Sequence, residues 1–260
     1  MAAGKRGPTG PFELSIGFLA VGALLSSFLW KENKAEEVES TNGEEKKKQT
    51  IKDALDVVRA DPKIMLVGAV QSLFEAAMYI FVLQWPPAIS GVVSKVFGEG
   101  ATPYGTVFSC FMASCLLGST IFGQLVKKNV PTETFTSSML SVATIAMGVA
   151  AWVSASSTAV AMPLATLVGA FFAFEACVGM YFPSIGTLRS KYVPDSHRSV
   201  IMNLFGIPLN ALVVSVFLSI KRLGVSGALS ISTGALALAT LSMMKLKSLA
   251  NNSEEKIAVA

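Results

Sequence analysis

Long apolar stretches that contain almost no charged residues constrain this chain more than any other feature. Residues 14–30, 100–126, 199–220 and 223–244 carry no charge, whereas residues 64–94 carry only Glu75 and residues 134–188 carry only Glu175. A helix that crosses a bilayer needs about 20 apolar residues, so residues 134–188 provide two spans. The sequence therefore predicts an all-α, polytopic membrane protein with seven transmembrane helices, at about 12–30, 64–88, 103–126, 134–154, 159–187, 199–220 and 223–245.

The charged residues between these stretches divide the chain into four parts. Residues 1–30 form a single span, residues 31–62 a cytoplasmic linker, residues 63–248 a six-helix bundle and residues 249–260 a cytoplasmic tail. The linker segment "KENKAEEVESTNGEEKKKQT" is mixed in charge and too poor in apolar residues to bury a core. The segment "TIKDALDVVRADPK" then has apolar residues at helical spacing, which predicts an interfacial helix before the second span.

The distribution of basic residues predicts the orientation of the chain in the membrane. With seven spans, 16 of the 21 lysines and arginines lie on one side. Basic loops stay in the cytoplasm, so we expect the C-terminus inside, the N-terminus outside or lumenal, and the cell membrane as the location. One alternative is that residues 1–30 are a cleaved signal peptide, which would leave six spans with the basic side outward. The net charge of +4 belongs to the loops and favours anionic lipid headgroups, not nucleic acid, as the partner.

A short internal repeat links the second and fifth spans. "FEAAMYIF" begins at Phe74 and "FEACVGMYF" begins at Phe174, 100 residues later, and each is followed by proline. This separation corresponds to three spans, so the second triplet is inverted relative to the first. Two inverted three-helix repeats, with interrupted helices near a site at the membrane midplane, are typical of secondary transporters.

The two intramembrane acids are the first candidates for a functional site. A charged residue at the centre of a span costs about 2.5–3.5 kcal/mol on insertion scales, and such residues often mark ion pathways. Gln71 and Tyr79 lie four residues before and after Glu75 and share its helix face. Either Glu75 is a protonated acid that only bonds to a neighbouring helix, or it faces a cavity and carries a proton. Glu175 is its counterpart in the second triplet.

Two further groups of polar residues complete the candidate pathway. Asn203 and Asn210 form a polar stripe with Gly206, which either lines a cavity or bonds to a neighbouring helix. Arg189, at the cytoplasmic end of the fifth span, is the candidate cation for an anionic substrate. The chain has no zinc-ligand spacing, no Walker loop and no nucleophile–base pair, so we expect no metal, no cofactor and no enzymatic activity.

Several stretches resemble the eukaryotic molybdate-anion transporter family, a branch of the major facilitator superfamily. They are "QSLFEAAMYIFVLQWPPAI", "FSCFMASCLLGS", "FEACVGMYFPSIGTLRSKYVPDSHRSVIMNLF" and "IPLNALVV". The resemblance implies twelve spans in two six-helix halves and molybdate as the substrate. Residues 12–30 would then be the last helix of an N-terminal half, and the six-helix bundle would be the whole C-terminal half.

The sequence departs from this family in two ways. The first five spans of the family pattern are not present, and Gly206 in "NLFGIPLN" stands where the resemblance leads us to expect arginine. An arginine would pair with an oxyanion or a buried glutamate.

These observations leave three hypotheses for function. The first is a secondary transporter of an oxyanion, molybdate, with proton coupling. The second is a transport-inactive or regulatory partial transporter, which needs a missing N-terminal half or a second copy as its partner. The third is a seven-span receptor, although the sequence lacks an acidic-Arg-Tyr motif at the end of the third span.

Overall fold

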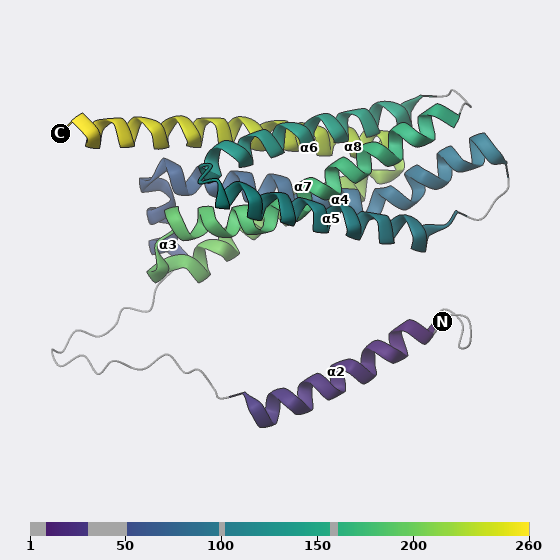
Figure 1. Ribbon diagram of the computed structural model, residues 1–260, viewed down its shortest axis with the longest axis horizontal. Coiled ribbons are helices and arrows are strands. Elements are labelled where there is room, and N and C mark those ends of the chain that lie inside the picture. The colour runs from purple at the N-terminus through teal and green to yellow at the C-terminus, as the bar shows by residue number, and fades with distance from the viewer. Residues whose placement is uncertain (1–8, 31–50, 99–101, 157–160, 260) are drawn as a thin grey trace. The chain divides into compact units, whose positions relative to one another are not determined.

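A computed structural model describes residues 9–30, 51–98, 102–156 and 161–259, and every regular element in them is helical (Figure 1). The prediction of an all-α protein is therefore confirmed. The elements are α2 (Gly10–Leu29), α3 (Ile51–Ala60), α4 (Pro62–Phe97), α5 (Tyr104–Lys127), α6 (Thr132–Ala155), α7 (Ala161–Tyr192), the 3-10 helix η2 (Asp195–His197) and α8 (Arg198–Val259).

Six of the described helices, α2 and α4 to α8, are long and apolar enough to cross a membrane. The sixth and seventh predicted spans both lie in α8, without a loop between them. Gly224 interrupts the helical geometry of α8 with φ 63° and ψ −177°, a conformation that glycine adopts without a steric penalty. The predicted boundary at residues 220–223 thus coincides with a kink, and the chain is a multi-pass membrane protein.

The helices are longer and more continuous than the sequence predicted. α4 continues through Pro86 and Pro87 to Phe97, whereas the prediction ended it at residue 88. Pro183 lies inside α7, and α8 extends through most of the segment expected to be a tail. The helices continue through these prolines, which the predicted spans 64–88 and 159–187 also contain. Transmembrane helices tolerate proline because neighbouring helices and local adjustment satisfy the freed carbonyl groups.

The chain forms two compact units, residues 1–47 and 48–260. In the first, α2 is the described element, and nearly all of its side chains are exposed. Most of the linker, residues 31–50, lies outside the described residues. The second unit begins with α3, the helix predicted from apolar spacing, and Asp61 then caps α4 by accepting a hydrogen bond from the Lys63 backbone N–H at 2.8 Å.

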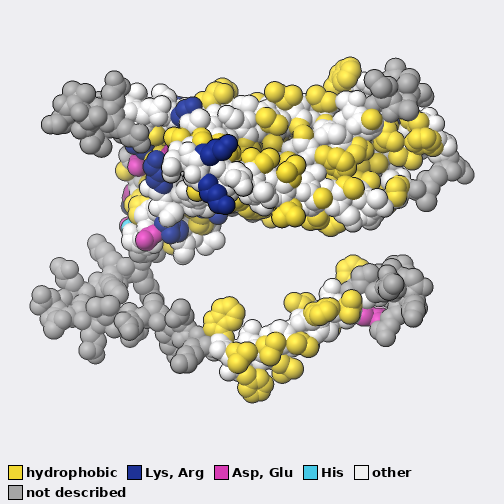
Figure 2. Space-filling model, in the orientation of Figure 1, with side chains coloured by type: hydrophobic (Ala, Val, Ile, Leu, Met, Phe, Trp, Pro, Cys, Tyr) yellow, Lys and Arg dark blue, Asp and Glu magenta, His cyan; other side chains and the backbone are white. Residues whose placement is uncertain are grey.

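The second unit is a bundle in which α4 packs on α8, α5 on α7, and α6 on both α7 and α8. Aromatic rings fill its centre: Phe74 stacks on Tyr181 with ring centroids 4.0 Å apart, and Phe81 lies 4.9 Å from Phe174. Figure 2 shows hydrophobic side chains along the flank of this unit and charged side chains at the end where α3 lies. This distribution is what a membrane-embedded flank with a polar end requires.

The α5 and α7 backbones meet at two glycines. A Cβ atom added at Gly118 would lie 1.8 Å from the Ala176 carbonyl oxygen, and one added at Gly179 would lie 1.9 Å from the Cys115 carbonyl oxygen. Small residues at such crossings let transmembrane helices approach closely, and their packing replaces the hydrophobic driving force that lipid does not supply. This crossing fixes α7 in the bundle and so helps to position the side chains described next.

Candidate functional site

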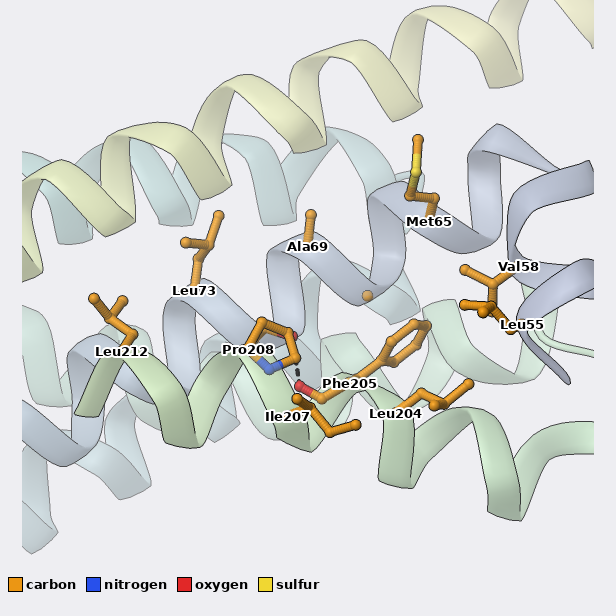
Figure 3. A pocket seen from close by; sticks show the side chains of 12 residues that line it. Leu55, Val58, Met65, Ala69, Leu73, Leu204, Phe205, Ile207, Pro208 and Leu212 are labelled. Atoms are coloured by element: carbon orange, nitrogen blue, oxygen red, sulfur yellow. Dashed lines mark hydrogen bonds between the residues drawn. The ribbon is translucent and has the colours of Figure 1, made fainter. Parts of the chain in front are cut away.

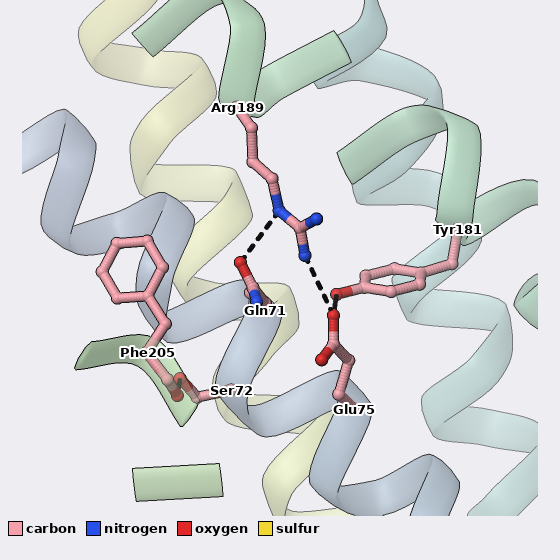
Figure 4. A network of polar contacts seen from close by, with 6 residues as sticks. All are labelled: Gln71, Ser72, Glu75, Tyr181, Arg189 and Phe205. Atoms are coloured by element: carbon pink, nitrogen blue, oxygen red, sulfur yellow. Dashed lines mark hydrogen bonds and ion pairs between the residues drawn. The ribbon is translucent and has the colours of Figure 1, made fainter. Parts of the chain in front are cut away.

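Glu75 lies on α4 where this helix crosses α7, and it forms an ion pair with Arg189. The distance between Arg189 Nη2 and Glu75 Oε1 is 3.1 Å, and the two side chains are 27% and 18% exposed (Figure 4). The hydroxyl group of Tyr181 donates a second hydrogen bond to the same oxygen at 3.0 Å. Glu75 thus has two hydrogen-bond donors on α7, of which one is a cation, and its contacts extend beyond a single bond to a neighbouring helix.

Gln71 connects Arg189 to α4 a second time. Its side-chain oxygen accepts a hydrogen bond from Arg189 Nε at 2.9 Å, and the glutamine is buried at 6% exposure. Because Gln71 and Glu75 are four residues apart, their side chains lie on the same face and hold two edges of one guanidinium group. Of the five guanidinium N–H donors, two bond to α4, and the others have no partner within the described chain.

Tyr181 is a residue of the candidate site that the sequence analysis missed. Its side chain is fully buried, and its ring stacks on Phe74, so its hydroxyl group is held in place beside Glu75. A signal for it existed, since Tyr181 and Arg189 are eight residues apart on α7 and therefore share a face. Tyr79, which the sequence analysis placed in the site, is 48% exposed and makes no side-chain hydrogen bond within the described residues.

Glu175 does not belong to this network. It is buried at 7% exposure, and no hydrogen bond or ion pair reaches its carboxyl group from the described part of the chain. Glu175 lies within electrostatic reach of Cys115 on α5, whereas Glu75 faces α7. The two acids of the repeat thus occupy different helix interfaces and different surroundings.

The polar stripe on α8 also lies apart from the Glu75 network. Asn203 and Asn210 are exposed, and the Asn210 side-chain amide donates to the Gly206 carbonyl oxygen of its own helix at 2.8 Å. Among the described residues neither asparagine bonds to another helix. A Cβ atom added at Gly206 would meet only the Asn210 amide at 3.8 Å, so this position has room for a larger side chain. The cation of the Glu75 network is Arg189 on α7.

A second buried acid holds the end of α7 to α6. Glu133, at the start of α6, accepts hydrogen bonds from Lys191 Nζ at 2.7 Å and from the Tyr192 hydroxyl group at 2.6 Å. The Glu133 side chain is 6% exposed and that of Lys191 is 48% exposed. Consecutive turns at the end of α7 therefore bind carboxylates on two different helices.

Comparison with known proteins gives the family. Residues 3–182 match a family described as sugar transporters with twelve transmembrane segments. The chain belongs to this transporter family, within the major facilitator superfamily. It resembles proteins named molybdate-anion transporter: it is 27% identical to one from Xenopus tropicalis over 206 residues, covering 79% of this chain and 42% of the relative.

Two further relatives carry the same name. The one from Takifugu rubripes is 28% identical over 224 residues, covering 79% of this chain and 45% of the relative, and the one from Danio rerio is 31% identical over 161 residues, covering 62% and 31%. These matches confirm the resemblance drawn from the sequence. The chain spans less than half the length of these relatives, and no solved structure is similar to it.

The ion pair gives a stability prediction for this transporter family member. We expect Arg189→Met to lower the free energy of unfolding by about 1–3 kcal/mol, because it leaves Glu75 with one donor and Gln71 with none. Glu75→Gln/Arg189→Met should be less destabilised than the sum of the single variants, since it leaves no unpaired charge. Reversible unfolding in mixed detergent micelles measures this, with Thr187→Ala, an exposed residue of the same helix, as the control. Strict additivity would show that the two side chains do not interact.

Proposed function

We propose that the protein is a secondary transporter of an oxyanion, with molybdate as the substrate, and that Arg189 binds the anion. The main observation in support is that Arg189 is held by Gln71 and Glu75 inside the bundle and still has N–H donors without a partner among the described residues. The family supports transport, and the relatives named molybdate-anion transporter support this substrate. Guanidinium groups suit oxyanions because their N–H donors match pairs of oxygen atoms and cannot be deprotonated.

The geometry supports a competition between Glu75 and the oxyanion for Arg189. In the ion pair the net charge of the two groups is zero, so a dianion gains little by approaching. A proton on Glu75 removes the competing charge and leaves a cation facing the substrate. Both hydrogen bonds reach Oε1, so Oε2 can take the proton while Tyr181 still donates to Oε1. Anion binding and proton binding at this site would then favour each other, which is reciprocal coupling.

The pH dependence of anion binding tests this proposal on residues 1–260. We expect molybdate to raise the unfolding temperature of the purified protein more at low pH than at high pH. Arg189→Gln should abolish the effect, because it removes the cation. Glu75→Gln should bind molybdate with little pH dependence, because the competitor is permanently neutral, and in a transporting form of the protein the same variant should lose most uptake. Lys191→Gln, two residues away and bound to Glu133, is the control. Unchanged binding in Arg189→Gln would refute the assignment.

A partner half completes this proposal. The pathway of such a transporter lies between two halves, and the described chain provides one six-helix bundle. We propose that a further half, from an N-terminal segment or from a second copy, supplies the other wall. A transport-inactive or regulatory partial transporter is the second candidate function, because the chain spans less than half of the relatives' length.

Expression of residues 1–260 distinguishes these two candidates. We expect the chain alone to leave molybdenum accumulation unrestored in cells that lack molybdate uptake, because one bundle cannot enclose a pathway between two halves. The measurement is intracellular molybdenum, with cells that carry an empty vector as the negative control and cells that express a full-length relative as the positive control. Uptake by purified residues 1–260 in liposomes would show instead that the chain, alone or as an oligomer, is a complete transporter.

We further propose that the protein lies in the cell membrane with its N-terminus outside and its C-terminus in the cytoplasm, as the basic loops favour. Asn251-Asn252-Ser253 is the N-glycosylation acceptor sequence of the chain, and we expect it to remain unmodified because it faces the cytoplasm. Gel mobility with and without glycosidase measures this, with Asn251→Gln as the control. A glycosidase-sensitive shift that Asn251→Gln removes would mean that the orientation is the reverse.

A further inference from the structure

An apolar groove lies between α3, α4 and α8, apart from the Glu75 network. Its volume is about 470 Å³, and Leu55 and Val58 of α3, Met65 and Leu73 of α4, and Ile207 and Pro208 of α8 line it (Figure 3). Met65 and Ile207 are 54% and 64% exposed, so the groove opens at the protein surface. A cavity of this size and lining is in the range that holds a small apolar ligand.

Close contact between α4 and α8 forms the floor of the groove. The Phe205 ring lies over Gly68, where a Cβ atom would come within 2.2 Å of it. Ser72 donates its hydroxyl hydrogen to the Phe205 carbonyl oxygen at 2.7 Å. The hydroxyl group of the one polar side chain that lines the groove is therefore satisfied, and water would find no good partner there. The groove suits a hydrocarbon chain.

The charges beside the groove distinguish a lipid from other apolar occupants. Lys52 and Arg59 lie three residues before and four residues after the groove residue Leu55, which places both next to it on the surface of α3. Both are exposed, and neither forms an ion pair within the described chain. Asp53 lies off this face, whereas Asp56, four residues after Lys52 and three before Arg59, lies beside both and offsets part of their positive charge. An apolar slot with two basic side chains at one edge is complementary to an anionic amphiphile.

We propose that this groove binds one anionic phospholipid, with an acyl chain between α4 and α8 and the phosphate group near Lys52 and Arg59. α3 is amphipathic and lies at the charged end of the bundle, the depth at which headgroups are found. The site lies outside the Arg189 network and does not depend on the transported anion. In the orientation proposed above it faces the cytoplasmic leaflet, which carries the anionic lipids.

Lipid titration tests this proposal on purified, delipidated residues 1–260 by native mass spectrometry. The probes are phosphatidylserine and phosphatidylcholine with identical acyl chains. We expect one phosphatidylserine to bind about fivefold more tightly than phosphatidylcholine, because Lys52, Arg59 and Asp56 together leave one net positive charge near the headgroup. Lys52→Gln/Arg59→Gln should bind both lipids equally, and Ala69→Phe, which fills the groove, should weaken both at least tenfold.

The matched control is Lys127→Gln/Lys128→Gln, which removes two exposed basic residues at the end of α5 and should leave the preference unchanged. A preference that survives in Lys52→Gln/Arg59→Gln, or that falls equally in the control, would overturn the proposal. The same spectra report oligomers. A dimer that Ala69→Phe abolishes while lipid binding stays unchanged would assign the groove to a second copy of the chain. Because these readouts need no molybdate, failure here leaves the proposed transport function untouched.

Discussion

A charged side chain inside a membrane bundle is costly unless an opposite charge lies beside it, and in this protein one such pair joins α4 to α7. An uncompensated charge within a bundle destabilises it by several kcal/mol, whereas a paired and hydrogen-bonded charge is tolerated. Arg189 reaches from the end of α7 to Glu75 and Gln71. Tyr181, eight residues earlier on α7, adds a second donor to Glu75. The register between the two helices follows from these contacts, because a shift by one residue would turn the partners onto different faces.

α7 is therefore the helix through which the bundle is connected. Its end binds carboxylates on α4 and α6, and its middle is held against α5 by the crossing at Gly118 and Gly179. A movement that separates α7 from α4 must break the Arg189 contacts. Because α5 and α7 cross closely at Gly118 and Gly179, such a movement would carry α5 together with α7. In the function proposed above, an anion that competes for Arg189 would weaken the contact at which such a movement begins. Substrate binding and helix rearrangement would then depend on the same interaction, because a ligand shifts a conformational equilibrium only through contacts that differ between the two states.

The sequence predicted the spans well because the bilayer imposes a length and a composition on each of them. It predicted the helix ends poorly, because Pro86, Pro183 and Gly224 bend or continue helices according to neighbours that periodicity does not reveal. Helical spacing correctly placed Gln71 and Glu75 together but gave Tyr79 the same weight. The true partners, Tyr181 and Arg189, come from positions 106 and 114 residues along the chain from Glu75. Such a contact depends on which helices pack together, so local patterns could not identify it.

The repeat explains why one acid is paired and the other is not. Phe74 and Phe174, the first residues of the two motifs, contact each other with ring centroids 5.9 Å apart, as equivalent residues do beside a two-fold axis. The Phe74–Tyr181 contact then has its counterpart in Phe174–Phe81, because each position is shifted by 100 residues.

The same shift carries Tyr181 to a phenylalanine without a hydroxyl group, and it carries Arg189 to Ile89, which is buried among apolar residues. Glu175 therefore lacks both of the donors that Glu75 has. The two triplets thus share the aromatic contacts Phe74–Tyr181 and Phe174–Phe81, but only Glu75 has a hydroxyl group and a guanidinium group beside it among the described residues. The tyrosine and the arginine at the α4–α7 crossing are therefore what distinguishes the Glu75 side of the repeat, which is the side where we propose that the anion binds.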